Sequence, residues 1–237
     1  MDLGLQNRVA LVVGGTGRIG AATARQLVAE GATVVIAARN AEKLAALATE
    51  LGVDSVVLDA ADDASVTSAI DEVLARHGRI DVAVLTAAPP VSTLDPARDL
   101  EAAHLLEAID GKSLGFLRVA TALLPHMTSA GFGRIVGVSG QIARMTTTLA
   151  GSVRNGTLNT IAKTLADSAA GTGVTINVVN PGPVLDETQH PAPERGRPGE
   201  SSYAEVASLI VFLTSVAAGG VSGEEIATGH KLLGVES

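Results

Sequence analysis

Short apolar runs alternate with longer stretches of helical periodicity along most of the 237-residue sequence. Each run is nearly all apolar, as expected for a strand of a parallel sheet that is buried on both faces. The segments between the runs, such as 66–77 and 158–169, repeat apolar residues at the spacing of one helix face. Alternation at this spacing predicts right-handed βαβ units. The predicted strands are 9–13, 33–37, 55–58, 82–86, 135–138, 174–179 and a late edge strand at 225–227.

The sequence therefore predicts an α/β fold, a Rossmann-type doubly wound parallel sheet in a single domain over 1–237. Residues 8–90 are its nucleotide-binding half and residues 91–237 its substrate half. Residues 181–202 are rich in proline and glycine and follow the carboxyl end of a strand, where open α/β sheets bind ligands. Because this segment is longer than an ordinary loop, we expect a flexible flap over a small-molecule substrate. The alternative is a plain surface connection.

Charge and composition exclude several classes of function. The 25 acidic and 17 basic side chains give a net charge of −8, which argues against a nucleic-acid or anionic-membrane surface. The absence of cysteine excludes disulfides and thiolate chemistry, and five scattered histidines predict no metal site. The first residues show no basic segment followed by an apolar run, and no apolar stretch approaches the ~18 residues of a membrane span. We therefore expect a cytoplasmic protein without a signal peptide.

A glycine-rich loop lies between the first predicted strand and the first predicted helix. Glycines let the backbone approach a pyrophosphate closely, and the helix N-terminus offers free N–H groups to the anion. Since the loop has the required strand before it and helix after it, we expect it to bind the phosphates of a dinucleotide. Its residues are Gly14, Gly15, Thr16, Gly17, Arg18, Ile19 and Gly20.

The end of the second strand indicates which dinucleotide binds. An NAD enzyme places Asp or Glu there to accept hydrogen bonds from the ribose 2′-OH. This chain has Arg39 and Asn40 instead, and a guanidinium forms a charge-assisted fork with a 2′-phosphate. Arg18 in the glycine loop adds a second positive charge. The sequence predicts NADP(H), the alternative being that both arginines are ordinary surface residues.

Several segments resemble the short-chain dehydrogenase/reductase family, and the likeness runs through nearly the whole chain. The glycine loop resembles that family's cofactor fingerprint, with Arg18 in the place of its middle glycine. The segment after the third strand is similar to the one whose aspartate contacts the adenine. Residues 81–88 resemble the strand that ends in Asn-Asn-Ala-Gly, and residues 177–184 the Pro-Gly segment whose backbone faces the nicotinamide. The resemblance implies further cofactor contacts at Asp59, Ala60, Ala87, Pro181 and Gly182.

The catalytic residues of the family do not carry over. The family uses Asn, Ser, Tyr and Lys: Tyr exchanges the proton, Lys lowers the pKa of Tyr and holds the ribose, and Ser polarises the carbonyl. The only tyrosine here, Tyr203, lies after the expected flap, so no shift of register restores the motif. The four family positions are occupied, in that order, by Lys112, Gly140, Gly151 and Asn155.

Lys112 and Asn155 look like an exchange in which the ammonium and the amide have traded places. In the family these two side chains lie close together through water near the nicotinamide ribose, so the exchange keeps one cation and one amide there. The alternative is independent substitution, with Lys112 exposed on a helix. The candidate replacement acids are Lys112, a bound water and Ser139, although Ser139 should point away from the face of residue 140. The candidate catalytic residues are therefore Ser139, Lys112 and Asn155.

Two further groups of polar residues lie near predicted helix starts. Ser152 and Arg154 lie at the start of one predicted helix, where an anion would find the backbone N–H of Ser152 and the guanidinium. Serine at such a position is also an ordinary cap. An acidic helix start is predicted at Asp95, Asp99 and Glu101. Negative charges there are expected to stabilise the helix macrodipole.

Three functions remain open at the level of sequence. The first is an NADP(H)-dependent oxidoreductase with a rebuilt active site. The second is a non-redox lyase, isomerase or cyclase on the same scaffold, and the third is a catalytically silent NADP(H) sensor or partner subunit. The resemblance also implies a homotetramer or homodimer built through long helices around 99–129 and 151–171.

Overall fold

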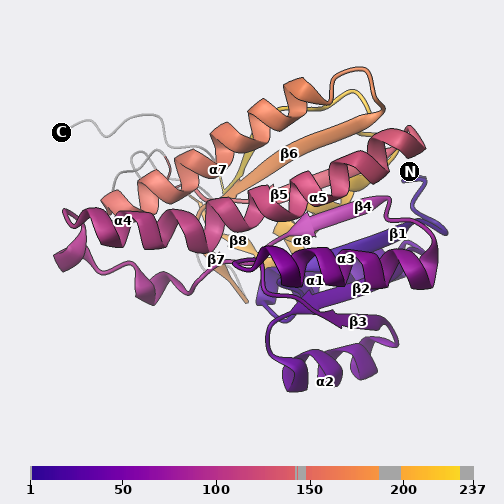
Figure 1. The fold of residues 1–237 in the computed structure, drawn as a ribbon, viewed down its shortest axis with the longest axis horizontal. Helices are drawn as coiled ribbons and strands as arrows, with labels where there is room; N and C mark the ends of the chain where they lie inside the picture. Colours follow the sequence, from indigo (N-terminus) through magenta and orange to yellow (C-terminus); the bar gives the residue numbers. More distant parts are fainter. Residues whose placement is uncertain (1, 142, 144–147, 187–198, 230–237) are drawn as a thin grey trace.

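The computed structural model describes residues 2–141, 143, 148–186 and 199–229 as one α/β domain with a seven-stranded parallel sheet (Figure 1). The strand order is β3-β2-β1-β4-β5-β6-β9, and every neighbouring pair is parallel. The strands are β1 (Val9–Val13), β2 (Thr33–Ala38), β3 (Asp54–Val57), β4 (Val82–Leu85), β5 (Gly133–Val138), β6 (Val174–Pro181) and β9 (Glu225–Thr228). The predicted fold is confirmed, and the late strand pairs with β6 at one edge as expected.

Helices cover both faces of the sheet because successive residues of each strand point to opposite sides. One face packs against α3, α5 and α7, and the other against α1, α2 and α8 (Figure 1). The five central strands are almost fully buried and mostly apolar, as a parallel sheet covered on both sides requires, whereas the edge strands β3 and β9 are partly exposed. The helices are α1 (Arg18–Ala29), α2 (Ala41–Leu51), α3 (Asp63–His77), α4 (Ala102–Ile109), α5 (Gly115–Ala130), α7 (Leu149–Ser168) and α8 (Tyr203–Thr214).

The strand order reverses at β1, from which β2 and β3 lie on one side and β4 on the other. This topological switch leaves a crevice at the carboxyl ends of the strands, where ligands bind in such sheets. The fold therefore places the glycine loop after β1 at the same edge of the sheet as the carboxyl ends of β4, β5 and β6.

The predicted long helix around 99–129 is interrupted. It begins at Ala102, and a π-helical turn over Asp110–Leu114 separates α4 from α5. The wider turn brings Lys112 and Ser113 inward, and both are buried. Such turns in helices frequently mark functional sites.

The expected flap over 181–202 falls mostly on residues 187–198, which lie outside the described residues. Its two flanks pair as short parallel strands, β7 (Val184–Leu185) with β8 (Ser201–Ser202). Within the described ranges, no helix has both the length and the apolar character needed to cross a membrane.

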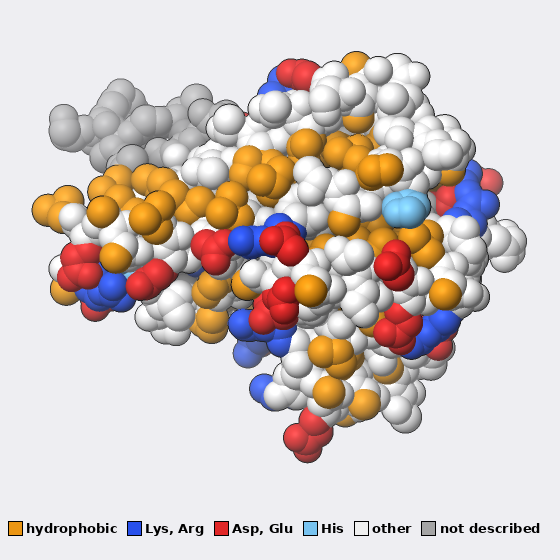
Figure 2. Space-filling model, viewed as in Figure 1, with side chains coloured by type: hydrophobic (Ala, Val, Ile, Leu, Met, Phe, Trp, Pro, Cys, Tyr) orange, Lys and Arg blue, Asp and Glu red, His pale blue; other side chains and the backbone are white. Residues whose placement is uncertain are grey.

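Hydrophobic side chains gather over α4 and α7 on one face of the molecule (Figure 2). Leu106 on α4 and Leu149 at the start of α7 are exposed. These are the helices for which the sequence predicts an oligomer interface, and that interface stays a prediction.

Two helical glycines provide a matched test of the glycine loop. A Cβ at Gly20 would collide with the carbonyl oxygen of Gly14, whereas a Cβ at Gly156 in α7 meets nothing within 4 Å. Gly20→Ala is therefore expected to lower the free energy of unfolding by about 1–3 kcal/mol, because backbone has to move. Gly156→Ala should raise it by up to about 1 kcal/mol through helix propensity. Urea unfolding measures both, and equal effects would contradict the close contact.

Candidate active site

A cleft of about 1110 Å³ opens at the carboxyl ends of the strands. Segments that follow β1, β4, β5 and β6 meet there with the π-turn and the start of α7. It is the place where the sequence predicts the nicotinamide end of the site. Its polar lining includes Arg18, Lys112, Ser139, Gln141, Arg154, Asn155 and Tyr203, and its backbone lining includes Gly17, Gly140, Pro181 and Gly182.

The glycine loop has the shape that a pyrophosphate needs. The N–H groups of Gly14 and Gly15 donate to the carbonyl of Ala37 at 2.8 and 3.1 Å, which fixes the turn against β2. A Cβ at Gly14 would lie 2.6 Å from the amide nitrogen of Ala87, so only glycine lets the two segments approach. Gly17 caps α1 without a side-chain hydrogen bond, so the first turn of the helix stays open to an anion. The residues present therefore fit the phosphates of a dinucleotide.

The residues that the sequence predicts to select the coenzyme lie at the tip of β2. Arg39 is exposed and makes no ion pair with any described residue. Asn40 caps α2 by accepting a hydrogen bond from the Lys43 backbone N–H at 2.8 Å. Arg18, in contrast, is already engaged: it pairs with Asp186 at 2.7 Å, and its guanidinium lies 5.4 Å from the ring centroid of Tyr203. Arg39 is thus the more available cation of the two.

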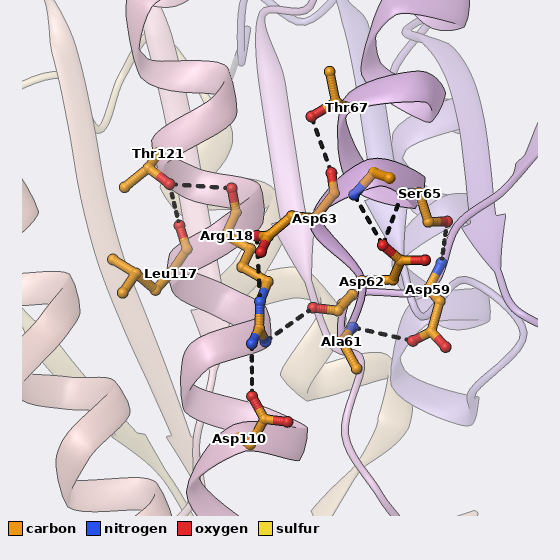
Figure 3. Close-up of polar contacts among 12 residues, drawn as sticks. Asp59, Ala61, Asp62, Asp63, Ser65, Thr67, Asp110, Leu117, Arg118 and Thr121 are labelled. Atoms are coloured by element: carbon orange, nitrogen blue, oxygen red, sulfur yellow. Dashed lines mark hydrogen bonds and ion pairs between the residues drawn. The ribbon is translucent and has the colours of Figure 1, made fainter.

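Arg118 ties the loop after β3, where the sequence predicts adenine contacts, to the π-turn (Figure 3). Arg118 on α5 donates to the Asp110 carboxylate at 2.7 Å and to the Ala60 carbonyl at 3.4 Å, and it lies 3.4 Å from Asp63. Asp59 accepts from the Ala61 backbone N–H at 3.0 Å, which shapes the loop after β3. This bracing fixes the position of the turn that carries Lys112.

The structure brings Lys112, Ser139 and Asn155 together. The Lys112 ammonium donates to Asn155 Oδ1 at 2.7 Å and to the Ser139 carbonyl at 2.9 Å. The Ser139 hydroxyl donates to the Asn155 carbonyl at 3.1 Å, and Asn155 Nδ2 donates to the Gly151 carbonyl at 2.9 Å. The amide and the amine are therefore direct hydrogen-bond partners. Lys112 is only 6% exposed, so the alternative of an exposed helical lysine is wrong.

The surroundings of Lys112 disfavour its charge. Burial and, to a smaller extent, the positive charge of Arg154 together lower the pKa of the Lys112 amine from 10.5 to about 7. No described carboxylate lies within ion-pair distance of the ammonium. A titratable group in a cleft whose pKa lies near neutrality is suited to exchange protons at physiological pH.

Arg154 lies on α7, one residue before Asn155, and lines the same cleft. It is 4% exposed, and its Nε and Nη1 atoms have no hydrogen-bond partner among the described residues. The predicted anion position beside the Ser152 backbone N–H is wrong, because that N–H donates to the Thr148 carbonyl at 2.9 Å.

The predicted acidic helix start also needs correction. Asp99 lies before α4, but its carboxylate accepts from the backbone N–H groups of Leu149 and Ala150 at 2.7 and 3.2 Å. It therefore caps α7, a different helix. Asp95 caps the short 3₁₀ turn over Pro96–Arg98, and Glu101 pairs with Arg98 at 2.9 Å. The donors at the start of α7 are thus satisfied within the protein.

Fold and cleft together define a dinucleotide-binding protein of the Rossmann class. The chain matches the family model for the short chain dehydrogenases over residues 8–196. It is 33% identical to the D-threitol dehydrogenase of Mycolicibacterium smegmatis over 95% of this chain and 92% of that protein. It is 32% identical to the cis-4-hydroxycyclohexanecarboxylate dehydrogenase of Sinomonas cyclohexanicum over 93% of this chain and 94% of that protein.

The crystal structure of gox2181 has a similar fold, with a TM-score of 0.85 and 26% identity over 96% of both chains. The chain belongs to the short-chain dehydrogenase family, whose members use nicotinamide cofactors. The glycine loop and the open first turn of α1 fit such a cofactor.

Replacing Lys112 by Met is expected to change how the free energy of unfolding depends on pH. The Lys112 pKa falls from 10.5 to about 7 on burial. Between these values the unfolded chain binds more protons at this residue than the folded chain does. Wild-type stability therefore rises with pH across this window, by at most about 1.4 kcal/mol per pH unit, and Lys112→Met lacks this contribution. The variant's advantage over wild type should be largest at or below pH 7 and shrink toward pH 10.

Urea unfolding at a series of pH values checks this. Lys163→Met is the control, because Lys163 is exposed on α7 and pairs with Asp167. Its curve should follow that of the wild type. Parallel curves for wild type and Lys112→Met would contradict the lowered pKa.

Proposed function

We propose that the chain is an NADP(H)-dependent oxidoreductase in which Lys112 carries the proton that the family's tyrosine otherwise carries. The observation on which this depends is the buried Lys112 amine in the cleft, bonded to Asn155 Oδ1 and the Ser139 carbonyl, with a pKa of about 7. An amine of this kind is present in both protonation states near neutral pH, as a proton carrier must be.

The choice of NADP(H) is supported by the tip of β2. A carboxylate there would bind the ribose 2′-OH of NAD, but the residues present are Arg39 and Asn40. The exposed Arg39 guanidinium, which pairs with no described carboxylate, is suited to the two oxygens of a 2′-phosphate. Arg18 would add to this only after giving up its contact with Asp186.

The glycine loop would hold the pyrophosphate, and Pro181 and Gly182 would border the nicotinamide, which supplies or accepts the hydride when it is bound. Lys112 acts at the substrate oxygen. In reduction its ammonium donates a proton to the carbonyl oxygen, and in oxidation its amine accepts the proton of the hydroxyl. Asn155 orients the amine through Oδ1, and Ser139 holds Asn155 through its hydroxyl.

The named relatives favour a hydroxyl and carbonyl pair as the reacting group. By their names they act on D-threitol and on cis-4-hydroxycyclohexanecarboxylate, and both compounds carry hydroxyl groups. A catalytically silent NADP(H) sensor is the second candidate, favoured by the glycines at 140 and 151. Binding of NADPH without turnover of any aldehyde, ketone, imine or enone in a broad panel would select the sensor.

Coenzyme choice is expected to depend on Arg39. Arg39→Gln should weaken NADPH binding by about tenfold or more, because a charge-assisted pair is lost, and should leave NADH binding nearly unchanged. Fluorescence titration with both nucleotides measures the ratio. Arg25→Gln is the control, since Arg25 is exposed on α1 and pairs with Glu50. Equal losses for NADPH and NADH would overturn the assignment of the 2′-phosphate to Arg39.

The pH dependence of turnover is expected to report Lys112. Reduction needs the ammonium, so its kcat/KM, which reports the free enzyme, should fall as pH rises through about 7. Oxidation needs the neutral amine, so its kcat/KM should rise through the same pH. Lys112→Met should lower kcat by about 10²–10⁴-fold in both directions and abolish the inflection, while Lys163→Met should do neither.

Stopped-flow measurement with the best substrate of the panel, between about pH 5.5 and 9, makes this comparison. A Lys112→Met variant that retains both the rate and the inflection would show that another group carries the proton.

A further inference from the structure

Arg154 differs from Arg134, the other deeply buried arginine among the described residues. Arg134 is 5% exposed, and its guanidinium donates to the carbonyls of Ser215, Gly133 and Gly173 at 3.1, 2.8 and 2.9 Å. It also lies 4.3 Å from the ring centroid of Phe132. Arg134 is a structural cation whose donors are satisfied. Arg154 is equally buried, yet its Nε and Nη1 atoms donate to nothing among the described residues.

An unpaired buried charge is costly, so proteins keep one only where a partner is supplied. The described part of the chain supplies none: no ion pair to Arg154 exists there. Lys112 interacts electrostatically with Arg154, but its ammonium is also positive and cannot serve as the partner. The partner of Arg154 must therefore enter from the cleft, which Arg154 lines beside Lys112, Ser139 and Gly140.

We propose that Arg154 binds a carboxylate of the substrate, so that the substrate is a carbonyl or hydroxy compound bearing one carboxylate group. Nε–H and Nη–H of a guanidinium form a planar fork that matches the two oxygens of a carboxylate. When the Lys112 amine is neutral, Arg154 is the one unpaired cation among the described lining residues, because Arg18 pairs with Asp186; one unpaired positive charge matches a monoanion better than a phosphate dianion. Leu94, Pro89 and Val138 line the remainder of the cleft and suit an apolar carbon frame.

The carboxylate also has a consequence for Lys112. The positive charge of Arg154 adds to the effect of burial in lowering the Lys112 pKa, and an anion on Arg154 would cancel that contribution. Arrival of the substrate would then favour the ammonium, the form that donates a proton in reduction. This substrate class rests on the proposed oxidoreductase function, but the anion site itself does not.

The binding test uses benzoate and benzamide, which share their shape and differ in charge. Isothermal titration at about pH 8, with and without NADP⁺, should give benzoate at least about tenfold tighter binding than benzamide. Arg154→Gln should remove this difference, and Arg76→Gln, an exposed arginine paired with Glu72 on α3, should preserve it. Equal binding of the two probes to wild type would overturn the site. Inorganic phosphate that binds through Arg154 more tightly than benzoate would overturn the carboxylate assignment.

Thermal unfolding keeps the proposal testable if Arg154→Gln is poorly soluble. Arg154→Met should leave the Tm unchanged or raise it, because it removes an unpaired buried charge. Arg134→Met should lower it by on the order of 5–10 °C, because three carbonyls lose their donor. A comparable fall in Tm for Arg154→Met and Arg134→Met would mean that Arg154 has a partner within the protein.

Turnover separates this proposal from the proposed function. With NADPH, 4-formylbenzoate should be reduced with a kcat/KM at least about tenfold above that of 4-formylbenzamide. In Arg154→Gln the two kcat/KM values should be nearly equal. Equal turnover of both aldehydes by wild type would overturn the carboxylate site and leave the oxidoreductase standing. Arg154-dependent benzoate binding without oxidation of NADPH by any carbonyl compound would leave the site standing and overturn the oxidoreductase.

Discussion

The burial of one amine beside one guanidinium governs the chemistry of this cleft. The π-turn at Asp110–Leu114 directs Lys112 inward, where Asn155 and the Ser139 carbonyl accept its hydrogen bonds but carry no negative charge. Burial and the like charge of Arg154 then act in the same direction and lower the pKa of the amine. A lysine on a regular helical turn facing solvent would keep its ordinary pKa and would be unsuited to proton exchange near pH 7.

The family resemblance implies that the amide and the amine have changed places between the π-turn and α7. In the structure Lys112 and Asn155 are hydrogen-bonded at 2.7 Å, which supports this interpretation. In the family, as the resemblance implies, the lysine acts on a tyrosine. With glycine at 151 the Lys112 amine has no phenol to act on, and it lines the cleft itself. We propose that the proton-carrying role thereby falls to Lys112.

The fold can be predicted from the sequence because the central strands are mostly apolar runs joined by helical crossovers, which leaves few topologies open. The sequence also brought Lys112 and Asn155 into one neighbourhood, since the family pattern fixes both positions. The π-turn was not foreseen, because residues 110–114 continue the helical pattern and nothing local marks the wider turn. The sequence places Asp99 at the start of the nearest predicted helix. Its actual role as a cap of α7 depends on a contact between residues 50 positions apart, which the sequence pattern does not contain. The missing partner of Arg154 is a property of packing, and only the structure reveals it.

The titration of Lys112 tests the account most directly. The chain has four lysines, at 43, 112, 163 and 231, so ¹³C-labelled lysine gives a simple NMR spectrum. The account predicts one Cε resonance that titrates near pH 7, that is absent from Lys112→Met and that moves to a higher pKa in Arg154→Gln. Four resonances that all titrate near the ordinary lysine value of about 10.4 would contradict it.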